Sequence, residues 1–242
     1  AMSELGDWRE ISVHGVEVAL ASLMVGRGMG YDRKKLLELG IAAFLENVGM
    51  YRIPAGILEK PTGLEPEEID LIREHPETST KILSRLGERY EWLAEVAFQV
   101  HERADGSGYP RGLKGSEISE AASIIGLVDT YVAMIRQRAY REKVLQPDAI
   151  RFILKEAKVQ FATKTLKAFL NSISLFPFDT YVKLNNKSIG RVITTDRNHP
   201  LRPTVEVLYD GLGNKPEQRE IVRLSDNPLL YIVETVDSRD LK

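Results

Sequence analysis

Residues 101–115 read His-Glu-Arg-Ala-Asp-Gly-Ser-Gly-Tyr-Pro-Arg-Gly-Leu-Lys-Gly, and the other sequence patterns are arranged around this segment. Glycines at positions 106 and 108 permit tight backbone turns that a side chain would block, and Pro110 fixes one φ angle. An apolar helical pattern follows directly. This composition predicts an ordered loop between two helices and is not typical of a spacer.

Helical periodicity dominates the chain up to about residue 175. Residues 8–29 have the apolar spacing of an amphipathic helix, and Asp32 is a suitable N-cap for a second helix over about 33–47. A further helix opens at residues 65–68, and His75-Pro76 interrupts it because proline disfavours α geometry in the preceding residue. More helices are predicted at about 77–86, 90–103, 117–139, 146–157 and 163–173.

The period changes near Phe176-Pro177. Short β-branched runs, separated by Asn, Asp, Gly and Pro, predict strands at residues 181–184, 190–193, 204–208 and 232–236. The sequence therefore predicts a mainly α protein, with a helical domain over residues 1–175 and a small C-terminal β subdomain over residues 176–242.

Composition excludes several classes of protein. The 242 residues suit one large domain plus a small one, and 43% hydrophobic residues with a net charge of −2 are typical of a globular protein. There is no basic excess that would favour DNA as a partner. No apolar run is long enough to span a membrane, and the N-terminus lacks the pattern of a signal peptide. Cysteine is absent, which excludes disulfides and thiolate metal sites and agrees with an expected cytoplasmic location.

Imidazole and carboxylate side chains that can ligate a metal are scattered over several predicted helices. Metal-dependent phosphodiester hydrolysis needs such groups around one point, where metal ions polarise the phosphate and generate hydroxide. The candidates are Glu10, His14, Glu46, Asn47, His75, His101 and Asp129. Spacing alone supports only Glu10 and His14, which are four residues apart and share a helix face. For the others, capping and salt bridges are the simpler explanation from the residues alone.

The segment 101–115 resembles the signature of HD-GYP domains, which hydrolyse the bacterial second messenger cyclic di-GMP at a cluster of metal ions. The resemblance implies an HD-domain-like helical bundle and covers essentially the whole helical domain. The β unit also resembles one that is appended to some relatives. The family's metal-binding positions correspond to Glu10, His14, Glu46-Asn47, His75, Val100-His101 and Asp129.

Three positions depart from the family pattern. Glu46-Asn47 stands where relatives have a His-Asp pair, Val100 replaces a histidine, and Met50 replaces a lysine near the phosphate. Asn47 has no charge and is expected to bridge two cations poorly, and Val100 cannot ligate. Because loss of one ligand or its support typically costs about 10–100-fold in metal affinity or activity, hydrolysis is expected to be impaired. The expected metal ligands are therefore Glu10, His14, Glu46, His75, His101 and Asp129, holding Fe or Mn, or no metal.

Two segments are candidates for binding the nucleotide. The signature residues Asp105, Gly106, Gly108, Tyr109 and Pro110 either shape the mouth of the pocket or form a docking surface for a GGDEF domain, which makes cyclic di-GMP. Residues 138–141 resemble a family segment whose arginines lie near the ligand's phosphates, and guanidinium groups suit phosphate. Arg138 and Arg141 are thus candidate phosphate ligands. Their alternative is the solvated basic end of the predicted helix 117–139.

Three functions stay open from the sequence. The first is a catalytically impaired HD-GYP domain that acts in signalling by binding cyclic di-GMP, a related dinucleotide or a partner protein. The second is an active phosphodiesterase with a rebuilt site, in which Glu10, His14, Glu46 and Asp129 hold one metal while His75 and His101 hold another. The third is a structural adaptor with an empty pocket.

Overall fold

The computed structural model describes residues 8–136, 144–155, 157–173, 176–196, 199 and 201–237. The chain divides into two compact units: one comprises residues up to 144 together with 151–173, and the other comprises 145–150 and the residues from 174 onward. The first unit is helical and the second contains a β-sheet, which confirms the predicted fold class. The domain boundary after residue 175 stays a prediction. Among the described helices, none combines the length and apolar character needed to cross a bilayer.

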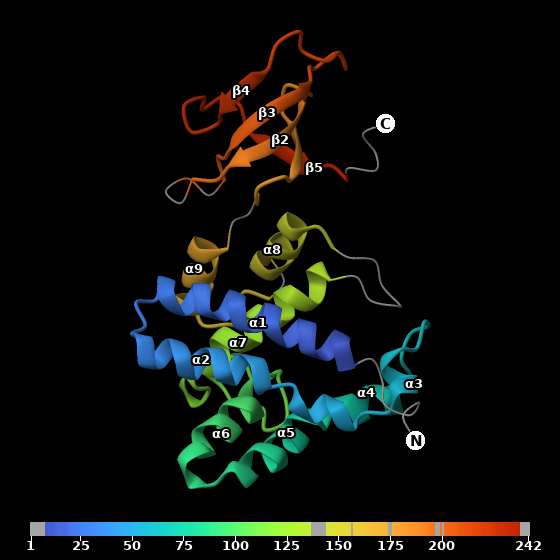
Figure 1. Ribbon diagram of the computed structural model, residues 1–242, viewed down its shortest axis with the longest axis vertical. Coiled ribbons are helices and arrows are strands. Elements are labelled where there is room, and N and C mark those ends of the chain that lie inside the picture. The colour runs from blue at the N-terminus through green and yellow to red at the C-terminus, as the bar shows by residue number, and fades with distance from the viewer. Residues whose placement is uncertain are drawn as a thin grey trace. The chain divides into compact units, whose positions relative to one another are not determined.

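Helices α1 (Trp8–Gly28) and α2 (Arg33–Leu45) form an antiparallel pair (Figure 1). Gly30, at φ +80°, supplies the left-handed turn between them, a conformation that glycine adopts without strain. The Asp32 side chain then accepts a hydrogen bond from the N–H of Lys35 at 2.8 Å, and so caps α2 as predicted. Close approach of the two helices depends on small residues, since a Cβ at Gly26 would lie 2.7 Å from a methyl of Leu39.

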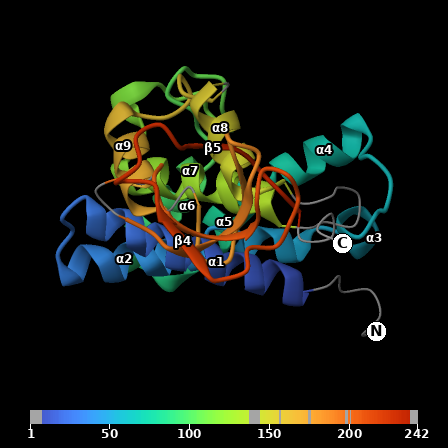
Figure 2. The same ribbon diagram turned by 90° about the horizontal axis from the view of Figure 1, so that it is seen from above.

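Helix α7 (Glu120–Ile135) forms the centre of the helical unit. The remaining helical elements are the 3₁₀ turn η1 (Val48–Arg52), α3 (Ala55–Leu58), α4 (Pro66–Arg73), α5 (His75–Leu83), the 3₁₀ turns η2 (Ser84–Leu86) and η3 (Glu88–Tyr90), α6 (Glu91–Gln99), the 3₁₀ turn η4 (Gly115–Glu117), α8 (Gln146–Lys155) and α9 (Thr163–Ser172). Helices α1, α6 and α9 all contact α7 (Figures 1 and 2). Ile124, Ile125, Leu127 and Val128 are fully buried there, and each contributes roughly 1.5–3 kcal/mol of burial free energy.

The helices on either side of the signature segment are shorter than predicted. Helix α6 ends at Gln99 because the chain turns there, and the carbonyl of His101 accepts from the N–H of Tyr109 at 3.2 Å. Helix α7 begins at Glu120 because Ser119 caps it by accepting from the N–H of Ala122. The residues between them form an ordered loop, as the glycine pattern predicts.

Pro76 lies in the first turn of α5, where its missing N–H has no helical partner to lose. The preceding helix α4 ends at Arg73. The predicted interruption is therefore confirmed, although α5 begins at His75 and not at residue 77. This start places the His75 side chain in the interior, where it is 3% exposed.

The second unit contains a five-stranded antiparallel sheet in the order β4-β3-β2-β1-β5. Its strands are β1 (Tyr181–Leu184), β2 (Ile189–Thr194), β3 (Thr204–Tyr209), β4 (Glu220–Arg223) and β5 (Ile232–Thr235). Alternating residues of the first three strands point into a small core that also contains Phe176 and Leu224. Strand β4 was not predicted, because its sequence Glu-Ile-Val-Arg is short and its residues are largely exposed at a sheet edge.

Candidate metal and nucleotide site

The side chains of His14 on α1 and Asp129 on α7 are hydrogen-bonded to each other inside the helical unit. Their Nε2 and Oδ1 atoms lie 2.8 Å apart, and each side chain is 12% exposed. The two residues are 115 positions apart in sequence, so only the packing of α1 on α7 brings them together. The pair supplies one nitrogen and one carboxylate to a common interior point.

Glu46 caps the C-terminal end of α2 and is 1% exposed. The side-chain amide of Asn47 donates a hydrogen bond to Glu46 Oε1, whereas Glu46 Oε2 has no hydrogen-bond partner. Ser79 fixes the backbone here, because its Oγ donates to the carbonyl of Glu46 at 2.7 Å and accepts from the N–H of Gly49 at 2.8 Å. A buried carboxylate oxygen without a partner is costly unless a cation or a proton joins it.

His75 and His101 form a second pair, with 2.9 Å between their Nε2 atoms. The Nδ1 atom of His75 lies 2.7 Å from the carbonyl oxygen of Ile72, which can only accept a hydrogen bond. That contact places the hydrogen of a neutral His75 ring on Nδ1 and leaves a lone pair on its Nε2, which accepts the hydrogen bond from His101 Nε2. This tautomer is the one that ligates a metal through Nε2.

These five residues form two overlapping ligand groups. One group comprises His14, Glu46 and Asp129, the other comprises Glu46, His75 and His101, and within each group the ligand atoms lie within 4.8 Å of one another. Glu46 belongs to both. Oxygen and imidazole donors around an unpartnered buried carboxylate fit a divalent cation, so the residues present suit the metal that the family resemblance implies.

Burial shifts the protonation of these groups in opposite directions. The pKa of Glu46 is raised well above its usual value by burial and then by the charge of Asp129, against the opposing hydrogen bond from Asn47. Burial and the neighbouring His75 lower the pKa of His101 to about 3, which keeps its ring neutral. Burial acts to raise the pKa of Asp129, but the hydrogen bond and charge of His14 outweigh it, and the pKa lies below its usual value. A neutral His101 and an ionised Asp129 are the forms of these two residues that bind a metal.

The signature loop folds back onto His101. Glu102, 3% exposed, accepts hydrogen bonds from the N–H groups of Arg111 and Leu113 at 2.7 and 2.9 Å, which closes the loop. Gly108 lies against the backbone of residues 101–103, where an added Cβ would come 2.4 Å from the nitrogen of Arg103. The ring of Tyr109 stacks on the ring of His101. The loop thus holds the side chain of a candidate ligand.

The other predicted loop residues contribute to the shape of this loop. Asp105 accepts from both the N–H and the hydroxyl of Ser107, and Gly106 has φ +82°. The peptide bond between Tyr109 and Pro110 is cis. Of the five loop residues predicted to bind the ligand, Tyr109 is the one whose ring stacks on a candidate metal ligand within the described residues.

Glu10 lies apart from both ligand groups. Its carboxylate is 61% exposed and accepts a hydrogen bond from Arg136 at 2.7 Å. The helix spacing that joined Glu10 to His14 is preserved, but Arg136 is its partner on the surface. Val100 is fully buried, and its apolar side chain has no atom that can ligate a metal. Arg138 and Arg141 lie outside the described residues.

Sequence reasoning missed Ser79 and the structural role of Glu102. Both are buried polar residues that bind backbone groups. Glu102 carried one signal, since it stands between a candidate ligand and a glycine-rich loop. Ser79 carried none, because its partners at Glu46 and Gly49 lie about 30 residues away in the chain.

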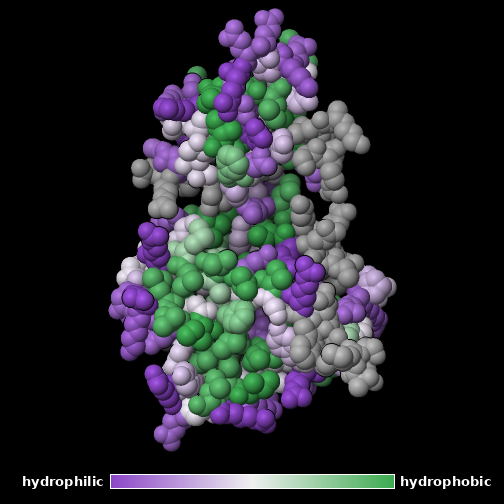
Figure 3. Space-filling model, viewed as in Figure 1, coloured by the Kyte–Doolittle hydropathy of each residue, from purple (hydrophilic) through white to green (hydrophobic). Residues whose placement is uncertain are grey.

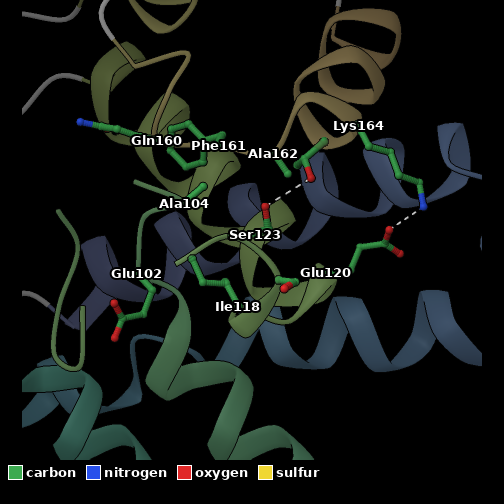
Figure 4. Close-up of a pocket in the computed structure, with 12 residues that line it drawn as sticks. Glu102, Ala104, Ile118, Glu120, Ser123, Gln160, Phe161, Ala162 and Lys164 are labelled. Carbon is green, nitrogen blue, oxygen red and sulfur yellow. Dashed lines mark hydrogen bonds and ion pairs between the residues drawn. The ribbon is translucent and has the colours of Figure 1, made fainter. Parts of the chain in front are cut away.

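A separate cavity of about 230 Å³ lies beside the signature loop and is not lined by any of the candidate metal ligands (Figure 4). It is bounded by Glu102, Phe161 and the pair Ser123 and Thr165, whose hydroxyl oxygens are 3.2 Å apart. At its rim Lys164 pairs with Glu120 at 2.6 Å. Glu102, Ser123, Thr165, Glu120 and Lys164 are thus all partnered within the protein.

Two protein-family profiles match this sequence. A sequence profile of the HD domain family matches residues 9–164, which is more than half of the chain. A profile of a KOW domain associated with HD domains matches residues 181–242. The two profiles thus account for the helical unit and the sheet.

Three curated relatives are similar over most of the chain. Cyclic di-GMP phosphodiesterase PdeB of Borreliella burgdorferi is 32% identical, covering 86% of this chain and 55% of that protein. A cyclic di-GMP phosphodiesterase of Pseudomonas aeruginosa is 28% identical over 88% of this chain and 51% of its own length. One of Thermotoga maritima is 34% identical over 70% and 47%. The chain spans about half the length of these relatives.

Among solved structures, a HDG"Y"P protein from Bdellovibrio bacteriovorus has the same fold, with a TM-score of 0.55 at 19% identity over 66% of this chain and 51% of that chain. At this identity the likeness concerns the fold alone. Together with the family profile and the signature at residues 101–115, it confirms the resemblance found in the sequence. The chain belongs to the HD domain family, and within it to the HD-GYP proteins.

Proposed function

We propose that the helical unit is a cyclic di-GMP signalling domain that binds a metal and the nucleotide but hydrolyses the nucleotide poorly. The names of the relatives support cyclic di-GMP, or a related cyclic dinucleotide, as the ligand. The metal is held by His14, Glu46 and Asp129, with His75 and His101 completing a second position around the shared Glu46.

One observation supports the proposal most directly. Glu46 is the carboxylate common to both ligand groups, and the side-chain amide of Asn47 donates a hydrogen bond to it. An asparagine that donates to Glu46 does not add a second negative charge between two cations. With the buried Val100 also unable to ligate, the site has fewer charged donors than its relatives' pattern implies. Weaker metal binding and slow turnover are the expected consequence.

Nitrogen and oxygen donors suit Mn or Fe better than Mg. A bound divalent ion would polarise a phosphodiester and lower the pKa of water there. The chain's own residues contribute orientation: Ile72 fixes the tautomer of His75, and Tyr109 packs on His101. Ser79 holds the backbone of Glu46, so the shared carboxylate is placed before any ligand arrives.

A second candidate is an active cyclic di-GMP phosphodiesterase. The shared position of Glu46 favours it, because a glutamate within reach of both groups can replace the missing charge of residue 47. Binding needs shape and charge, whereas turnover also needs stronger stabilisation of the transition state than of the bound substrate. The two candidates therefore differ chiefly in turnover of the nucleotide, and the first also expects weaker metal binding.

The separating experiment measures metal content, cyclic di-GMP affinity and cyclic di-GMP turnover after purification with Mn or Fe. The proposed function expects bound metal and nucleotide with negligible turnover, and expects His14→Ala to lose the metal. His199→Ala, an exposed histidine of the second unit, is the matched control. Steady turnover that disappears with His14→Ala supports the active enzyme. Absence of both metal and nucleotide binding overturns both candidates and leaves the structural adaptor.

Two contacts with partners rest on the resemblance and remain proposals. The exposed signature residues Asp105 and Ser107 offer a surface to a GGDEF domain. Arg138 and Arg141 are proposed phosphate contacts, and substituting them with alanine is expected to weaken nucleotide binding without removing the metal.

A further inference from the structure

Arg73 brings a positive charge to the edge of the candidate metal site. It is the last residue of α4, and the carbonyl of the preceding Ile72 accepts a hydrogen bond from Nδ1 of His75 at 2.7 Å. Helix α4 lies at an edge of the helical unit where hydrophilic residues predominate, whereas apolar residues gather over α1 and α2 (Figures 1 and 3). The backbone of Arg73 is therefore fixed next to a candidate ligand, while its side chain is 59% exposed.

The guanidinium of Arg73 lies over the ring of Tyr109, with 5.8 Å between its Cζ atom and the ring centroid. A cation at this distance is attracted by the negative face of an aromatic ring. The same tyrosine ring stacks on His101. One side chain thus connects the guanidinium to a candidate metal ligand, and two contacts, one through the backbone and one through Tyr109, place Arg73 beside the histidine pair.

The charge of Arg73 is only weakly neutralised within the protein. Its ion pair with Asp70 is long, with 3.7 Å between NH1 and Oδ1, and the two side chains are 59% and 76% exposed. Exposed pairs of this kind contribute little to stability, so a better partner can replace Asp70 at small cost. The contact with the tyrosine ring occupies no acceptor atom, which leaves the N–H donors of the guanidinium available to an anion.

Three other arginines around the candidate ligands are held by protein groups. The Arg103 guanidinium donates to two backbone carbonyls and to the hydroxyl of Thr130. Arg111 pairs with a carboxylate of α6 at 3.2 Å, and Arg136 pairs with two carboxylates of α1 at 2.7 and 3.3 Å. Of these four arginines, Arg73 is the one most loosely attached, and it is therefore best placed to bind a charged ligand.

We propose that Arg73, held over Tyr109, binds a phosphate of the cyclic dinucleotide at this site. The ligand groups themselves contain the carboxylates of Glu46 and Asp129, so a phosphate bound beside them needs positive charge from outside the groups as well as from a metal. A guanidinium supplies that charge and can form two parallel hydrogen bonds to phosphate oxygens. This assignment rests on the proposed function, which supplies the ligand, and it adds a contact from α4.

The test measures the Kd of cyclic di-GMP for the Mn(II)-loaded whole chain by calorimetry at low salt. Arg73→Gln is expected to weaken binding by ~10-fold or more, because a charge-assisted hydrogen bond is lost. Arg73→Lys is expected to recover part of the loss, since it keeps the charge but not the planar fork. The gap between wild type and Arg73→Gln is expected to narrow as KCl is added, because salt screens exposed charges.

Arg89→Gln is the matched control. Its guanidinium lies 5.7 Å over the ring of Tyr90, a contact like that of Arg73, but at the opposite end of α6 from His101. The control is expected to bind cyclic di-GMP like the wild type. An equal loss in Arg73→Gln and Arg89→Gln would contradict the assignment, because position beside the ligand groups would then not matter.

The Mn(II) affinity, measured by competition with a chelator, separates contact with the nucleotide from support of Tyr109. Arg73→Gln is expected to leave the Mn(II) affinity unchanged. If that affinity falls as much as the nucleotide affinity, Arg73 acts through the tyrosine and the proposal is overturned. An unchanged Kd for cyclic di-GMP in Arg73→Gln overturns the assignment of Arg73 alone, whereas a wild type that binds Mn(II) but no nucleotide overturns the proposed function together with it.

Discussion

The ring of Tyr109 lies parallel to the ring of His101, with 5.0 Å between their centroids and 1° between their planes. On its edge, His101 also meets His75 at 82°. The signature tyrosine thus confines a candidate metal ligand from one face while a second ligand confines it from another. The physical role of this loop residue is to limit the rotation of the imidazole.

Removing the Tyr109 ring is therefore expected to loosen the metal site. Tyr109→Ala is expected to weaken Mn(II) binding by about 10–100-fold, the usual effect of losing a group that orients a ligand. Tyr109→Phe keeps the stacked ring and is expected to bind like the wild type. Competition with a chelator measures both affinities without any turnover. Equal losses in the two variants would show that the hydroxyl, and not the stacking, matters.

Asn47 can be tested by restoring a negative charge at its position. In the metal-free protein Asn47→Asp loses the hydrogen bond to Glu46 and sets two carboxylates side by side, so it is expected to unfold at lower temperature. With Mn(II) present the added charge is expected to strengthen binding, and binding to the folded state raises stability. The gap in Tm between metal-free and metal-loaded protein is thus expected to widen. The exposed Asn171→Asp is the control, and an unchanged gap for Asn47→Asp would contradict the assigned role.

The buried Glu46 predicts a specific pH dependence in the metal-free protein. Its folded-state pKa is raised, so the stability it contributes is complete below its unfolded pKa of about 4.3 and is lost as pH rises through the folded-state value. Glu46→Gln removes this loss. The variant is expected to gain on the wild type as pH rises, by up to about 1.4 kcal/mol for each unit of pKa shift.

Urea unfolding of chelator-treated protein between pH 5 and pH 8 measures this difference, since the slope with pH reports proton uptake. The exposed Glu67→Gln on α4 is the matched control and is expected to show no trend. A wild type that gains stability relative to Glu46→Gln as pH rises would contradict the raised pKa.

The fold class was predictable, because helix periodicity is a local pattern, whereas most of the candidate ligands were named from the family resemblance. The proximity of His14 to Asp129 was not, since 115 residues separate them and the family resemblance alone joined them. Glu10 shows the limit of spacing: it shares a helix face with His14, yet Arg136 takes its carboxylate. Residue spacing identifies a shared face but not the partner that occupies it.

Asn47 also shows why a substitution cannot be interpreted from one position. Its neutral amide suggested a weakened metal site, and the structure adds that the amide binds the one carboxylate shared by both ligand groups.

Strand β4 was missed because edge strands are stabilised by pairing with a neighbouring strand and not by their own sequence.

Gly108 is packed closely against the backbone of the residues before it. An added Cβ would lie 2.4 Å from the nitrogen of Arg103 and 2.5 Å from the Cα of Glu102, and backbone atoms cannot move aside as a flexible side chain can. Gly108→Ala is therefore expected to cost roughly 1–3 kcal/mol of unfolding free energy and to shift Tyr109 away from His101, which lowers Mn(II) affinity as well. Gly63→Ala, where no heavy atom lies within 4 Å, is the matched control and is expected to change stability by less than about 0.5 kcal/mol. If both variants unfold alike and bind Mn(II) alike, the loop tolerates a side chain at residue 108, and its close packing cannot be what holds the tyrosine on the histidine.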